Sequence, residues 1–126
     1  MKTLLALAIP LVFASCATIS PPAPKGSIDH VVLMWQKRPG NAADRAALIA
    51  ACEKLRAVPG IRSLHTGTAL PSDRPIVDDS FDVGLTVRFD SAADLAAYGP
   101  HPLHLKQKDE VLVPLTRKIL VYDIVR

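Results

Sequence analysis

The pattern of apolar and polar positions along the chain predicts four β-strands. From residue 81 to 89 every second side chain is apolar, which is typical of a strand with one buried face. Residues 28–36 and 119–125 are apolar on both faces, as strands are when both of their sides are covered. Residues 61–70 show a weaker pattern and predict the remaining strand. The buried face of the alternating strand would carry Phe81, Val83, Leu85, Val87 and Phe89.

Helical spacing and capping residues predict the elements between the strands. Asn41 is a favoured helix N-cap, and apolar side chains recur at helical spacing after it until Pro59-Gly60 ends the helix. Ser91, with Asp94 three residues later, is close to a capping box and predicts a short second helix. The inward-facing stripe of the first helix would consist of Leu48, Ala51, Cys52 and Leu55.

A last helix is predicted from His101-Pro102 to about Lys118, because proline suits the first helical position, and Pro114 would kink it. The resulting order, β-α-β-β-α-α-β, matches a ferredoxin-like split βαβ plan of the α+β class. Helices can cover only one face of such a sheet, yet the first and last strands are apolar on both faces. We therefore expect a second copy to cover the free face, which gives a homodimeric α/β barrel.

The first residues are typical of a targeting segment. Residues 1–15 combine a positive start with a short apolar run, which predicts a secretory signal peptide. The sequence from Phe13 to Cys16 resembles a bacterial lipobox, so we expect lipidation at Cys16 and anchoring without a membrane span. Ala17 then implies the outer membrane, on its periplasmic face. Ordinary cleavage after Ala17, which would release a soluble periplasmic protein, is the alternative. Residues 16–26 would be a proline-rich tether, and residues 27–126 the folded domain.

Charge and cysteine content exclude several classes of function. The net charge is +3 without a basic stripe, so no nucleic-acid partner is expected. If Cys16 is lipidated, only Cys52 remains and no intramolecular disulfide can form. Cys52 lies on the apolar helix face, which favours a small buried side chain over a reactive thiol. Because phosphate-binding glycine loops, redox cysteine pairs and nucleophile motifs are absent from the sequence, we expect no cofactor.

Residues 98–104 concentrate the candidate chemistry. His104 would lie in the first turn of a helix capped by His101, where the positive end of the helix dipole disfavours a second positive charge. A neutral imidazole can act as a base, and Tyr98 could hydrogen-bond to it or to a bound carbonyl group. The alternative is that His101 only stabilises the turn and His104 only satisfies a buried polar contact. His30 would line a cavity if the face that it shares with Val32 does so; otherwise it is a half-buried strand end.

A metal site is not expected. His101 and His104 are three positions apart, which can bring two imidazoles to one side of a helix. Two ligands do not complete a site, since three or four protein ligands are usual. Nothing in the spacing points to the others.

Short motifs spread over residues 28–125 carry a family resemblance. They are His30-Val31-Val32-Leu33, Val58-Pro59-Gly60-Ile61, Phe81-Asp82-Val83-Gly84-Leu85, Phe89-Asp90-Ser91, Leu95-Ala96-Ala97-Tyr98, His101-Pro102-Leu103-His104 and Val121-Tyr122-Asp123. Together they resemble the stress-responsive A/B barrel family, also called Dabb, which implies a dimeric α+β barrel.

The resemblance also suggests a possible reaction. Some plant members of the family look like polyketide cyclases, in which a Tyr and the second His of a His-Pro-x-His motif act in a small apolar cavity. Tyr98 and His104 match those two positions, and His30 matches a histidine on the first strand. Val83 stands at about the place of the cyclases' third-strand histidine, which makes cyclase chemistry less favoured.

Two functions follow as hypotheses. The first is an envelope-anchored homodimer that binds a small apolar or aromatic metabolite, without a defined reaction. The residues expected to contact the ligand are His30, Val32, Val83 and His101. The second is an enzyme acting on a small ketone, with Tyr98 and His104 as catalytic residues. A cofactor-free oxygenase is a third possibility, by analogy of barrel architecture alone.

Overall fold

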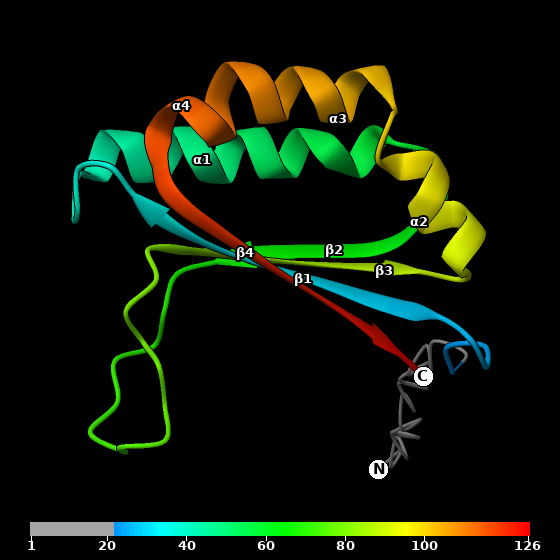
Figure 1. Ribbon diagram of the computed structural model, residues 1–126, viewed down its shortest axis with the longest axis horizontal. Helices are drawn as coiled ribbons and strands as arrows, with labels where there is room; N and C mark the ends of the chain where they lie inside the picture. The colour runs from blue at the N-terminus through cyan, green and yellow to red at the C-terminus, as the bar shows by residue number, and fades with distance from the viewer. Residues whose placement is uncertain (1–21) are drawn as a thin grey trace, which may run out of the picture.

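The structure is a computed structural model and describes residues 22–126. Four antiparallel strands form one sheet in the order β2-β3-β1-β4, and the helices lie on one of its faces (Figure 1). This arrangement confirms the predicted ferredoxin-like α+β fold. The predicted signal peptide and Cys16 lie outside the described residues. The elements are β1 Ile28–Gln36, α1 Ala42–Lys54, β2 Ile61–Gly67, β3 Val83–Phe89, α2 Ala92–Tyr98, α3 Pro102–Gln107, α4 Val113–Leu115 and β4 Thr116–Val125.

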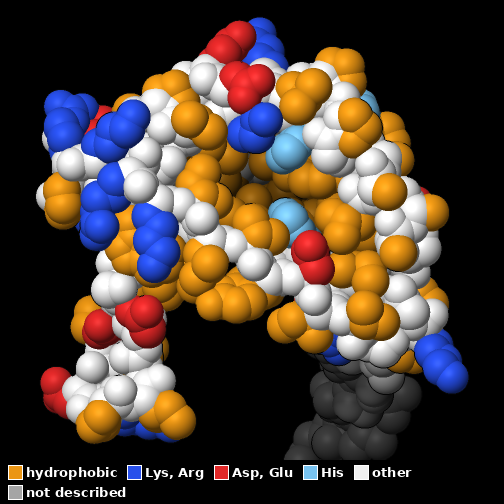
Figure 2. Space-filling model, viewed as in Figure 1, with side chains coloured by type: hydrophobic (Ala, Val, Ile, Leu, Met, Phe, Trp, Pro, Cys, Tyr) orange, Lys and Arg blue, Asp and Glu red, His pale blue; other side chains and the backbone are white. Residues whose placement is uncertain are grey.

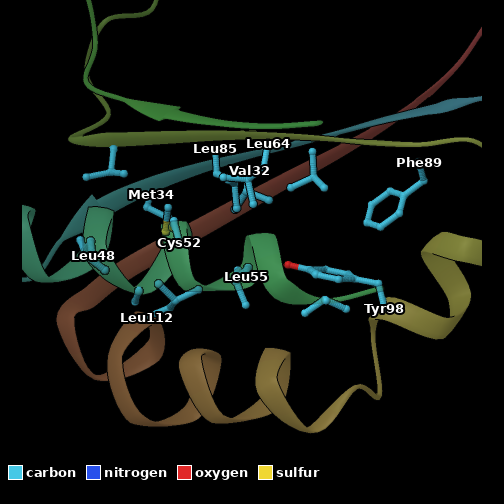
Figure 3. Packing of buried hydrophobic residues seen from close by; sticks show 14 of the residues in the cluster. Val32, Met34, Leu48, Cys52, Leu55, Leu64, Leu85, Phe89, Tyr98 and Leu112 are labelled. Atoms are coloured by element: carbon cyan, nitrogen blue, oxygen red, sulfur yellow. The ribbon is translucent and has the colours of Figure 1, made fainter. Parts of the chain in front are cut away.

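The hydrophobic core lies between the helices and the covered face of the sheet (Figure 3). The predicted caps set the ends of the helices: Asn41 Oδ1 accepts the Asp44 backbone N–H at 2.9 Å, and Ser91 Oγ accepts that of Asp94 at 3.2 Å. The inward stripe predicted for α1 and the 3₁₀ turn after it is confirmed. The side chains with no exposed surface include Met34, Leu48, Cys52, Leu55, Leu64, Val83 and Phe89.

The C-terminal half of the chain differs from the predicted boundaries. The helical region ends at Leu115 rather than near Lys118, because a π-helical segment, Lys108–Leu112, follows α3 and only one short turn, α4, remains. The Thr116 hydroxyl donates to the Leu112 carbonyl at 2.6 Å at the point where β4 begins. The last strand is therefore longer than predicted, and β2 ends at Gly67 instead of residue 70.

Phe81 does not share the buried face predicted for the alternating strand. Strand β3 begins only at Val83, and the Phe81 ring lies over Gly84, where a Cβ would come within 3.2 Å of it. The same ring meets Trp35 edge to face, with centroids 6.5 Å apart. Since Gly84 and Trp35 alternate with the buried positions of their strands, Phe81 lies on the side of the sheet away from the helices.

That second side, which we call the open face, has no covering layer within residues 22–126. Val31 and Leu33 of β1 lie beside Tyr122 and Leu120 of β4 on it. A polar cluster occupies the end of the open face near the start of β1, where the Arg88 and Arg126 guanidinium groups each donate to Asp29, at 2.7 and 2.6 Å. The hydrogen bond from Arg88 is the main reason why the pKa of Asp29 is lowered. Apolar side chains around a paired charge cluster are a composition suited to an interface.

Candidate functional site

A cavity of about 280 Å³ lies between the helices and the covered face of the sheet. Figure 2 shows its mouth, a hollow in which two histidine side chains sit in a largely hydrophobic surround. Strands β1, β3 and β4 form one wall, and the helical elements form the other. The lining residues are His30, Val32, Leu55, Leu85, Leu95, Tyr98, Gly99, His104, Lys108, Leu112, Val113, Ile119 and Val121.

The structure brings four of the six predicted ligand-binding and catalytic residues to this cavity. His30, Val32, Tyr98 and His104 line it. Val83 does not: it pairs with Met34, is completely buried in the core and lies outside the lining.

His101 also lies outside the cavity lining. It is the N-cap of α3, where its Nδ1 accepts the Leu103 backbone N–H at 3.2 Å. This contact favours the turn-stabilising alternative for His101 over ligand contact.

His104 presents a basic nitrogen to the cavity. Its Nδ1 lies 2.7 Å from the Gly99 carbonyl oxygen, and because a carbonyl can only accept, Nδ1 carries the proton and Nε2 keeps its lone pair. Burial is the main cause that lowers the pKa of His104, and the nearby Lys108 and His30 lower it further; the bond to Gly99 opposes them. The imidazole is therefore held neutral, as predicted, although burial rather than a helix dipole is the main reason.

Tyr98 separates the two histidines and forms an inner wall. Its ring centroid is 4.3 Å from that of His104 and 5.9 Å from that of His30. Figure 3 shows its hydroxyl directed toward Leu55, at the inner end of the site. Within residues 22–126 this hydroxyl has no hydrogen-bond partner, and burial raises its pKa. The possible hydrogen bond between Tyr98 and His104 is thus not formed; their rings pack together, and the hydroxyl is available to a ligand.

Asp123 completes the polar end of the site and was not predicted to belong to it. It lies directly opposite His30 across the β1–β4 pair, with its Oδ1 2.6 Å from His30 Nδ1. An ionised carboxylate only accepts, so this contact places the His30 proton on Nδ1 and leaves Nε2 as an acceptor. The pairing depends on the register of two strands that are far apart in the sequence, and no local pattern reveals it.

Two further properties of residues 22–126 bear on the chemistry. No three His, Cys, Asp or Glu side chains in this range are grouped so that they could hold a metal ion. No helix in the same range has both the length and the apolar character needed to cross a membrane. Cys52 is buried, and this burial raises its pKa to about 12, so its thiol is a core side chain and not a nucleophile.

Comparison with known proteins identifies the domain. Residues 28–126 match the family model described as the stress responsive A/B barrel domain, Dabb. A search of curated proteins found no match.

Solved structures share the fold. A Dabb family protein with a ferredoxin-like fold from Mesorhizobium loti is 25% identical, with a TM-score of 0.66 over 81% of this chain and 98% of that one. Hydroxynitrile lyase from Passiflora edulis is 23% identical, with a TM-score of 0.70 over 82% and 95%. A dimeric ferredoxin-like protein from a Jannaschia species is 24% identical, with a TM-score of 0.65 over 80% and 100%.

Proposed function

The chain belongs to the stress responsive A/B barrel domain family, and on this basis we propose that it is a homodimer whose subunits each bind a small apolar or aromatic molecule. The cavity is the observation that carries this proposal. Its walls are mainly aliphatic, while the polar atoms come from His30, Tyr98, His104 and Lys108. An apolar body with one polar group fits this distribution, because small-molecule sites combine apolar walls with a few placed polar groups.

The size of the cavity limits the ligand. A volume of about 280 Å³ lies at the lower end of the range for small-molecule sites. A single aromatic ring with a short polar substituent therefore fits better than a fused polycyclic molecule. Acetophenone and indole are suitable probes because they combine one compact apolar body with one acceptor or one donor.

Filling the cavity is expected to weaken this binding. Val121 lines the mouth and is 45% exposed, so the indole of Val121→Trp can enter the cavity without displacing the core. We expect the Kd for acetophenone, measured by ligand-observed NMR, to rise at least about tenfold. Leu105→Trp is the matched control, since Leu105 is 38% exposed on α3 and does not line the cavity. If the wild type binds neither probe, or if both variants bind like the wild type, this cavity is not the ligand site.

The homodimer proposal rests on the open face. Tyr122 and Ile124 of β4 are 52% and 54% exposed there, beside the half-buried Val31 and Leu33. A second sheet packed against this face would cover these side chains, and the dimeric Jannaschia protein of the same fold supports such an arrangement.

We also propose that the protein is anchored to the bacterial cell envelope through lipid on Cys16. The apolar run followed by a lipobox-like sequence supports this proposal. Replacing Cys16 by Ser should abolish the incorporation of an alkyne-labelled fatty acid in cells and release the protein from the membrane fraction. A protein that labels equally with and without Cys16 is not lipidated there. A wild-type protein that never labels and is found in the periplasmic extract supports the soluble alternative.

An enzyme acting on a small ketone is the second candidate, favoured by the fixed tautomer of His104. A neutral imidazole with a free Nε2 can remove a proton from the carbon next to a carbonyl group. The hydroxyl of Tyr98 can donate to the carbonyl oxygen and stabilise the enolate that forms. Both groups line the same cavity.

A further inference from the structure

A long arm, residues 68–82, joins β2 to β3 and projects from the sheet on the side of the open face (Figure 1). Leu70 and Ile76 on this arm are 83% and 85% exposed, the largest exposed fractions of any large hydrophobic residue within 22–126. Figure 2 shows hydrophobic side chains at the far end of the arm. Single exposed apolar residues are common on protein surfaces, but two on one projecting arm suggest a contact surface.

Hydrogen bonds inside the arm hold its shape. Asp79 accepts the Ser72 backbone N–H at 2.9 Å, and the Val77 N–H donates to the Arg74 carbonyl at 2.9 Å. Asp78 accepts the Ser80 N–H at 3.0 Å. The exposed side chains are thus carried on an ordered backbone, and docking would cost little conformational entropy.

The base of the arm is attached to the open face. Trp35 Nε1 donates to Ser80 Oγ at 3.0 Å, and the Gln36 backbone N–H donates to Asp82 at 2.8 Å. Phe81 covers Gly84 next to these contacts. The arm therefore stands in a fixed direction relative to the face that a second subunit would cover.

We propose that the arm reaches past the dimer interface and packs Leu70 and Ile76 against the second copy of the chain. This inference rests on the homodimer proposed above and adds a second contact region to it. Packed sheets lie about 10 Å apart, whereas a hairpin of this length extends at most roughly 23 Å. A subunit docked on the open face would thus lie within reach of the arm, and burying its apolar side chains would stabilise the dimer.

Sedimentation equilibrium of the purified full chain tests the contact. The double variant Leu70→Ser/Ile76→Ser should raise the dimer Kd about tenfold or more, because it removes apolar area from the contact. Leu105→Ser/Val113→Ser is the matched control: both residues are exposed hydrophobics on the helical side, and this variant should keep the wild-type Kd. A photo-reactive phenylalanine at position 76 should cross-link two copies, whereas one at Ala50, exposed on α1, should not.

The outcomes separate this inference from the proposal on which it depends. A wild-type dimer that the arm variant weakens, together with a cross-link between copies at position 76, supports the contact. A wild-type dimer with an unchanged Kd in the arm variant overturns the contact and leaves the homodimer standing. A wild-type protein that is monomeric at tens of micromolar removes both.

Discussion

Replacing Val31 by Arg is expected to convert the dimer into a monomer. Val31 lies on β1, between Thr86 of β3 and Tyr122 of β4, in the middle of the open face. A guanidinium group at this position would be buried by the second subunit without an acidic partner, and the symmetry of a homodimer would place two such groups in one interface. A penalty of about 4 kcal/mol corresponds to a rise in Kd of about a thousandfold.

Sedimentation velocity at micromolar concentration measures this change directly. Ala47→Arg is the matched control, because Ala47 is exposed on α1 and the same charge there meets only solvent. Circular dichroism checks that Val31→Arg keeps its secondary structure. A folded Val31→Arg protein that dimerises as tightly as the control would show that the open face is not the interface.

The second large effect is expected at His104, if the protein enolises small ketones. His104→Gln keeps a polar side chain of similar length but removes the basic nitrogen. The rate of deuterium incorporation into the methyl group of acetophenone in D₂O, followed by NMR, should fall about 10²–10⁴-fold. His65→Gln is the matched control, since His65 is exposed on β2 and lies outside the cavity. Wild-type exchange no faster than that of His104→Gln would remove the enzyme candidate and leave ligand binding untouched.

The pH dependence of the two proteins provides an independent check. The pKa of His104 is lowered below the usual 6.5, mainly by burial. The basic form therefore persists at slightly acidic pH, and wild-type exchange should decline only as the pH falls through the lowered value. The same shift affects stability: the unfolded chain binds a proton between 6.5 and the lowered pKa, so this contribution to stability is full above 6.5 and is lost as the pH falls. His104→Gln should lack that component of the acid sensitivity.

Local signals were enough to predict most of the fold. The Asn41, Ser91 and His101 caps each use a side-chain acceptor within three residues of its donor, so the sequence alone contains both partners. Strand alternation identified the buried face of β3 from Val83 onward. Phe81 was misplaced because the chain leaves the strand geometry before Val83, and an alternating pattern does not show where pairing stops.

The candidate site was only partly predictable for a related reason. Tyr98 and His104 are close in sequence, and a turn between two short helices brings them together. Asp123 reaches His30 only through the β1–β4 register, and Lys108 reaches the cavity only through the π-helical segment. Contacts of this kind depend on the tertiary structure, which neither residue spacing nor composition specifies.

The π-helical segment limits which changes in length the chain can accept. Residues 108–112 form a wider turn than an α-helix, and both Lys108 and Leu112, at its two ends, line the cavity together with Val113. Deleting one residue there would restore α-helical winding and rotate everything that follows by about 100°. Val113 would then leave the cavity wall, and the chain would enter β4 out of step with Gln36. Conservative exchanges of side chains are therefore tolerable in this segment, whereas a single-codon deletion would disturb both the site and the sheet.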